Sequence, residues 1–206
     1  MKRITNLLLW IVGTMFILGC AHQVTLRTTI QPNALIAKKL PKTVVVIFSG
    51  EMPTYVESVK PSSFAGSAHT YNFELGKALC PALFRSVETV YDKVILSKSI
   101  QPQDQYDGII KFSLANSNMD VYFQEGFLSS IAKANCSISV TIEAYDNSGK
   151  LLRKTTVNGS GFSSKGTDVF SANKSFAAAA ETAIQQIADN VANLLISGFA
   201  EEQSGK

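Results

Sequence analysis

The stretch from Ala134 to Ala144 most tightly constrains the fold, because it alternates apolar and polar side chains without a break. Such alternation predicts a strand with one buried and one solvent-exposed face, as in an antiparallel sheet covered on one side. The sequence Asn147-Ser148-Gly149 then predicts a turn, and we expect the strand from Leu151 to about Phe162 to fold back as a hairpin. The apolar positions of the first strand are Ala134, Cys136, Ile138, Val140, Ile142 and Ala144.

Earlier segments add further predicted strands. Thr43 to Phe48 is an almost continuous β-branched and aromatic run, which favours a strand buried on both faces or at the centre of a sheet. A weaker strand is expected from Val24 to Ile30, and two more from Val87 to Leu96 and from Asp107 to Leu114.

Two segments have helical periodicity. One helix is expected from about Thr70 to Arg85, with Pro81 inside it and a kink or loosening near Lys77. The other has an apolar stripe that Gly198 is placed to end, and its alanine-rich first half allows close approach to a sheet. The stripe consists of Phe176, Ala180, Ala183, Ile184, Ile187, Val191, Leu194 and Leu195. We therefore predict an α+β fold, an antiparallel sheet with two amphipathic helices packed on one face.

The N-terminus has the pattern of a targeting signal. Lys2 and Arg3 precede an apolar run from Leu7 to Leu18, which is shorter than the ~20 residues that span a bilayer. The following Gly19-Cys20 resembles the lipobox of bacterial lipoproteins, although Leu18 is larger than the residue usual there. This resemblance implies cleavage before Cys20, acylation of Cys20 and, because Ala21 rather than Asp follows, anchoring in the outer membrane facing the periplasm. An ordinary signal peptide is the alternative.

These signals divide the chain into four parts. We expect a signal peptide at 1–19, a lipidated tether at 20–23, a single α+β periplasmic domain at 24–200 and a polar tail at 201–206. Without Lys2 and Arg3, the 19 basic side chains fall to 17 against 16 acidic ones. A nearly neutral domain without a dense Lys/Arg patch is a poor partner for nucleic acid.

Three features together resemble the YajG-like group of Gram-negative lipoproteins. They are the Gly19-Cys20 signal, the stretch from Met119 to Lys150 and the stretch from Ser171 to Val191. The likeness is a pattern of strands, turn and terminal helix, and it covers the C-terminal half better than the N-terminal half. It implies an envelope lipoprotein with no catalytic residues to carry over.

A search for reactive groups points the same way. His22 and His69 have no second ligand at metal-binding spacing, and neither a nucleophile elbow nor a phosphate loop is found. The carboxylates Asp104, Asp107, Asp120 and Glu125 are read as solvated loop residues rather than an acid–base pair. We predict a non-enzymatic protein with no metal and no cofactor.

Two function classes remain. The first is a binding or assembly module that engages another envelope protein. The second is a carrier or chaperone for a lipid or glycolipid, which needs an apolar groove between helices and sheet. The segment 120–131 supplies the candidate partner contacts Tyr122, Phe123 and Phe127, although the favoured alternative is that these side chains extend two strands and fill the core.

The cysteines beyond Cys20 leave two possibilities. Cys80 lies on the apolar stripe of the first helix and Cys136 on the buried face of the best strand. If that helix covers that strand, a disulfide can form in an oxidising compartment. Two separate core thiols are the favoured alternative.

Overall fold

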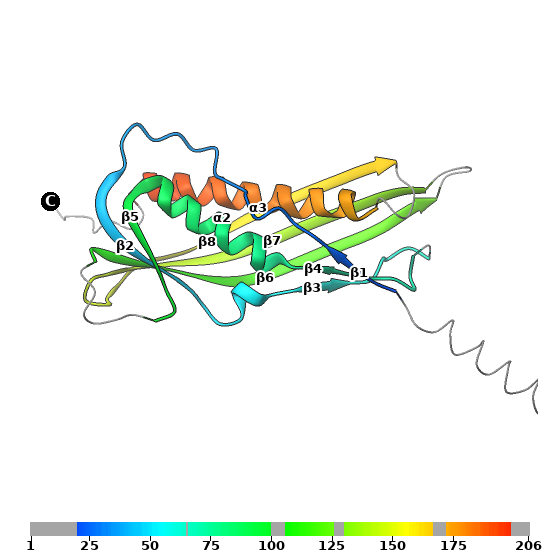
Figure 1. Ribbon diagram of the computed structural model, residues 1–206, viewed down its shortest axis with the longest axis horizontal. Helices are drawn as coiled ribbons and strands as arrows, with labels where there is room; N and C mark the ends of the chain where they lie inside the picture. The colour runs from blue at the N-terminus through cyan, green and yellow to red at the C-terminus, as the bar shows by residue number, and fades with distance from the viewer. Residues whose placement is uncertain (1–19, 65, 100–105, 126–129, 167–171, 199–206) are drawn as a thin grey trace, which may run out of the picture.

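The computed structural model describes residues 20–64, 66–99, 106–125, 130–166 and 172–198, and it has an α+β fold (Figure 1). A 3-10 turn, η1, spans Met52–Thr54. The helices are α2 (Leu75–Val90) and α3 (Ala172–Ile196). The strands are β1 (Ala21–Val24), β2 (Leu40–Phe48), β3 (Glu57–Val59), β4 (Thr70–Phe73), β5 (Tyr91–Ser97), β6 (Gly108–Glu125), β7 (Ser130–Asp146) and β8 (Leu151–Gly166).

The larger sheet has five strands in the order β5-β2-β6-β7-β8. β6, β7 and β8 are antiparallel neighbours, but β2 runs parallel to both β5 and β6. The prediction of a purely antiparallel sheet is therefore wrong. The chain leaves β2 and returns to β5 through α2, and parallel neighbours require such a crossover connection.

β2 is buried on both faces, as its unbroken apolar run predicted. Val44 and Val46 belong to the main core, together with the buried side chains of both helices. Val45 and Ile47 face the other way and form a second, smaller cluster with Ile109. Alternate residues of a strand point to opposite faces, so a strand with apolar groups at every position needs cover on both.

The long hairpin of β7 and β8 confirms the prediction from alternation. All six apolar positions from Ala134 to Ala144 are buried. The Asp146 carboxylate accepts backbone N–H groups of Ser148 and Lys150, each at 2.9 Å, and Gly149 takes φ +82°. An aspartate and a left-handed glycine are the residues such a turn favours.

A small second sheet has the strand order β1-β4-β3 and includes two segments that the sequence did not predict as strands. Thr70–Phe73, predicted as the start of the first helix, is strand β4, and α2 begins only at Leu75. Tyr71 and Phe73 are both buried, and their spacing of two residues is that of one face of a strand rather than of a helix. Ala21–Val24, most of which falls in the segment predicted as a tether at 20–23, pairs with β4 as strand β1.

α2 continues through Pro81 to Val90. Proline has no N–H, so the carbonyl of Lys77 lacks its helical partner. Ser86 ties α2 to α3, because its hydroxyl donates to the carbonyl of Ala188 at 2.9 Å.

α3 lies unusually close to β8, where both elements carry small residues. A β-carbon at Gly159 would lie 2.2 Å from the carbonyl oxygen of Ala183, and one at Gly161 would lie 2.0 Å from that of Ala179. Alanines on the helix and glycines on the strand therefore allow backbone-to-backbone contact. This confirms the expectation that the alanine-rich half of the helix approaches the sheet closely.

Gly161→Ala should destabilise the protein by about 1–3 kcal/mol, because the added methyl group forces α3 away from β8. Urea unfolding followed by circular dichroism measures the change. Ser164→Ala, at an exposed position of the same strand, is the control and should leave the midpoint near wild type. An unchanged midpoint for Gly161→Ala would contradict the close packing.

Candidate functional site

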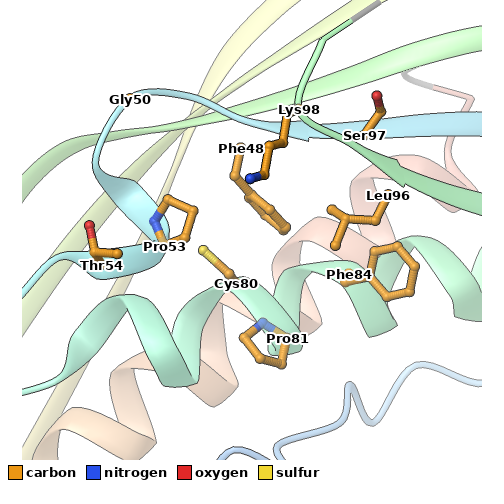
Figure 2. Close-up of a pocket in the computed structure, with 10 residues that line it drawn as sticks. All are labelled: Phe48, Gly50, Pro53, Thr54, Cys80, Pro81, Phe84, Leu96, Ser97 and Lys98. Atoms are coloured by element: carbon orange, nitrogen blue, oxygen red, sulfur yellow. The ribbon is translucent and has the colours of Figure 1, made fainter.

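One cavity is an apolar groove of about 880 Å³ between α2, η1 and the ends of β2 and β5 (Figure 2). Pockets that hold ligands commonly have volumes of about 300–1,000 Å³. The groove is lined by Phe48, Gly50, Pro53, Thr54, Cys80, Pro81, Phe84, Leu96, Ser97 and Lys98.

The parallel pairing of β2 and β5 creates the floor of this groove. Parallel strands end at the same edge of a sheet, and ligand sites of such sheets lie outside their carboxyl ends. Val46 pairs with Leu96, so Leu96 and Phe48 lie on the face that carries Val46 toward the main core. Figure 2 shows Phe48 and Leu96 directed toward the side chains of α2.

α2 and η1 form the walls. Cys80, Pro81 and Phe84 line the groove from α2, while Pro53 and Thr54 line it from η1. Gly76 allows the two elements to touch, since a β-carbon there would lie 2.2 Å from the carbonyl oxygen of Met52. The backbone N–H of Gly76 also donates to the Tyr55 carbonyl at 3.0 Å.

The chemistry of the lining suits binding of an apolar group. Lys98 is the one charged side chain among the lining residues. Burial raises the pKa of the Cys80 thiol to about 12, so the thiol is neutral at physiological pH and is a poor nucleophile. Nothing in this lining assembles a base beside a nucleophile.

The predicted partner contacts at 120–131 are not brought together on the surface. Phe123 is only 4% exposed, and its ring lies edge-on to Phe176 of α3 with centroids 5.7 Å apart. Phe123 is therefore a core side chain, as in the favoured alternative. Tyr122 is half-buried, with the Lys133 ammonium 6.0 Å from its ring centroid. Phe127 lies outside the described residues.

Cys80 and Cys136 are both buried free thiols in the same core cluster. Burial also raises the pKa of the Cys136 thiol to about 12, with a smaller contribution from the negative charge of Glu57. Cys20, by contrast, is exposed at the start of β1. The structure thus has the two core thiols separate, which was the favoured alternative.

The two histidines, which the sequence presented as unrelated, are neighbours. His22 Nε2 and His69 Nδ1 lie 2.7 Å apart, and the ring of His22 stacks on Tyr71 at 5.0 Å between centroids. The pairing of β1 with β4 brings them together across 47 residues. In the part of the chain that the structure describes, no group of three His, Cys, Asp or Glu side chains could hold a metal ion.

Of the four carboxylates considered from sequence, the structure describes the side chains of Asp107 and Asp120. The Asp107 carboxylate accepts the backbone N–H of Thr43 at 2.7 Å, which fixes the start of β6 beside β2. Asp120 is half-buried on β6. Asp104 lies outside the described residues, and Glu125 ends β6.

Sequence reasoning missed the groove, because its lining comes from segments spread between residues 48 and 98. One available signal was Pro81. A proline that interrupts an apolar helix face marks a place where regular packing is broken, and its ring lies on the groove wall.

Comparisons with known proteins inform the fold only. No protein-family model and no curated protein matches the chain. The crystal structure of protein XCC0632 from Xanthomonas campestris, a DUF330 protein, superposes with a TM-score of 0.54 at 14% identity, over 89% of this chain and 99% of that one. The structure of a minor lipoprotein from Acinetobacter baumannii superposes with a TM-score of 0.42 at 12% identity, over 79% of this chain and 96% of that one.

The first likeness shows a shared fold, and the second is too weak to add to it. Membership of the YajG-like group stays a prediction. Within the described residues, no helix is long and apolar enough to cross a membrane.

Thiol labelling tests the state of the cysteines. In native protein at pH 8, Cys80 and Cys136 should resist alkylation by iodoacetamide, because they are buried and stay protonated. In denaturant without reductant both should react, as found by mass spectrometry of the peptides. If the peptides that contain Cys80 and Cys136 were alkylated only after reduction, the two cysteines would instead form a disulfide.

Proposed function

We propose that this chain is a lipid-anchored, non-enzymatic binding module of the outer membrane. In this proposal it faces the periplasm and engages another envelope protein through the apolar groove. The observation that carries the proposal is the groove itself, an open apolar cavity beside β5, which is the edge strand of the sheet among the described residues. The Gly19-Cys20 signal and the exposure of Cys20 support the anchor.

A protein partner suits this groove because β5 is an edge strand. One side of an edge strand offers unpaired N–H and C=O groups, to which an extended segment of another protein can add. Leu96 on this strand is 59% exposed and lines the groove. A partner strand beside β5 would therefore place an apolar side chain over Leu96 and Phe84.

A second candidate is a carrier for a lipid or glycolipid. It is favoured by the continuous apolar lining and by Lys98, whose ammonium group suits a phosphate or carboxylate headgroup. Small-molecule sites usually enclose most of their ligand, however, whereas the exposure of Leu96 leaves this groove open. We therefore place the protein partner first.

We further infer that both helices cover one face of the five-stranded sheet. α3 contacts β7 and β8, α2 contacts α3 and β5, and the buried side chains of both helices lie in the main core. In this arrangement the groove lies between α2 and the last residues of β2 and β5.

Photo-crosslinking at the groove separates the two candidates. A benzoylphenylalanine at position 96 should crosslink to another envelope protein in intact cells, because the partner covers Leu96. The same group at position 35, where Leu35 is also exposed but does not line the groove, is the matched control. Adducts with lipid alone at position 96 would favour the carrier, and no adduct at all would contradict a site in this groove.

Leu96→Asp should abolish capture of this partner while the melting temperature stays near wild type, because the side chain is largely exposed. Leu151→Asp introduces the same charge at another exposed leucine and should leave capture unchanged. Turnover of an envelope substrate by the purified protein would overturn the non-enzymatic part of the proposal.

Cys20→Ser tests the anchor. Without the thiol the chain cannot be acylated at this position, so the precursor should stay uncleaved or the mature protein should leave the membrane fraction. Several acyl chains hold a protein far more firmly than one, so wild type should be found entirely in the membrane fraction and the processed variant entirely outside it. Fractionation of the variant with the outer membrane, cleaved as in wild type, would count against lipidation at Cys20.

A further inference from the structure

The domain begins immediately after the proposed anchor, with no spacer. The Cys20 carbonyl accepts the backbone N–H of Thr70 at 3.0 Å, and Ala21 is already in register with Thr70 in the small sheet. Acyl chains on Cys20 would thus leave the protein at this end of β1 and β4. This inference rests on the lipid anchor of the proposed function.

The loop that joins β3 to β4 lies at the same end of the molecule (Figure 1). Its aromatic residue, Phe64, is 93% exposed. The other large apolar side chain with comparable exposure among the described residues is Leu35. Leu35 lies elsewhere, because its neighbour Asn33 bonds Asp189 in the C-terminal half of α3.

The loop is fixed to the domain on both sides of Phe64. The Ser62 N–H donates to the Val121 carbonyl, and the Ser63 hydroxyl accepts the Phe123 N–H, each at 2.9 Å. On the other side, Gly66 adopts φ +80° and packs so tightly that a β-carbon would lie 2.7 Å from the Phe123 ring. These contacts therefore hold Phe64 in the solvent, at the end of the molecule where β1 begins.

The charge of this segment suits a bilayer surface. Between Glu57 and Glu74 the sequence contains no acidic residue, and it contains Lys60 and His69. Lys60 is exposed at the end of β3. Aromatic rings favour the interfacial layer of membranes, and a neighbouring cation is attracted to anionic headgroups.

We propose that Phe64 and Lys60 make a second membrane contact, in which Phe64 inserts into the interfacial layer of the leaflet that holds the acyl chains of Cys20. The acyl chains fix the distance of the domain from the bilayer. Phe64 adds a second point of attachment, so the domain takes a defined orientation rather than rotating freely about its anchor.

A single tryptophan reports this contact, because the only tryptophan of the chain is Trp10. All variants carry Trp10→Phe, and the full chain is produced in a Gram-negative host, purified from membranes and reconstituted in phosphatidylethanolamine–phosphatidylglycerol vesicles. Phe64→Trp should show a blue-shifted emission that brominated lipids of the same headgroups quench. Leu35→Trp is the matched control and should keep a solvent-like emission without quenching.

The outcomes separate this contact from the anchor. Intact mass reports whether residues 1–19 are removed and whether Cys20 carries acyl chains. Solvent-like, unquenched emission from position 64 in vesicle-bound protein would overturn the loop contact and leave the anchor standing. Equal quenching at positions 64 and 35 would overturn it too, because it would mean that the domain has no fixed orientation. A processed chain without acyl groups would refute the anchor. If the tryptophan emission of Phe64→Trp in that chain did not change when vesicles were added, the loop contact would be refuted as well.

Discussion

The burial of β2 on both faces is the constraint on which the rest of the structure depends. Val44 and Val46 face the main core, and Val45 and Ile47 face the second cluster, so both faces of β2 must be covered. In the sheet β2 lies between β5 and β6. Its neighbours on both sides are parallel to it. This pairing requires the crossover through α2, and the crossover places the carboxyl ends of β2 and β5 opposite the helix, where the groove forms.

The opposite edge strand of the sheet, β8, is partly covered by α3. α3 lies on the backbone of β8 at Gly159 and Gly161, and Gln186 accepts the N–H of Ser160 at 2.7 Å. Asn190 donates to the carbonyl of Asn158 at 3.2 Å, so side chains of the helix occupy backbone groups of this edge strand. These bonds hinder strand addition at this part of β8. The two edges thus differ, and β5 is the one beside an open apolar groove.

Local patterns predicted the elements whose stability is local. The β7–β8 hairpin followed from alternation and an Asp-Asn-Ser-Gly turn, and α3 followed from its apolar stripe and Gly198. Strand direction was not predictable, because an apolar run such as Thr43–Phe48 has the same composition in parallel and antiparallel sheets. The small sheet, the pairing of His22 with His69 and the groove depend on contacts between distant segments, for which a single sequence carries no periodic signal.

The proposed site of partner binding in the envelope is the groove beside β5. Hydrogen–deuterium exchange of the protein in isolated outer membranes, compared with the same protein in lipid-only vesicles, tests it most directly. If a partner covers the groove, the amides of β5 and of 48–54 should exchange more slowly in the outer membranes than in the vesicles. Equal exchange of these segments in both preparations, with protection confined to other elements, would contradict it.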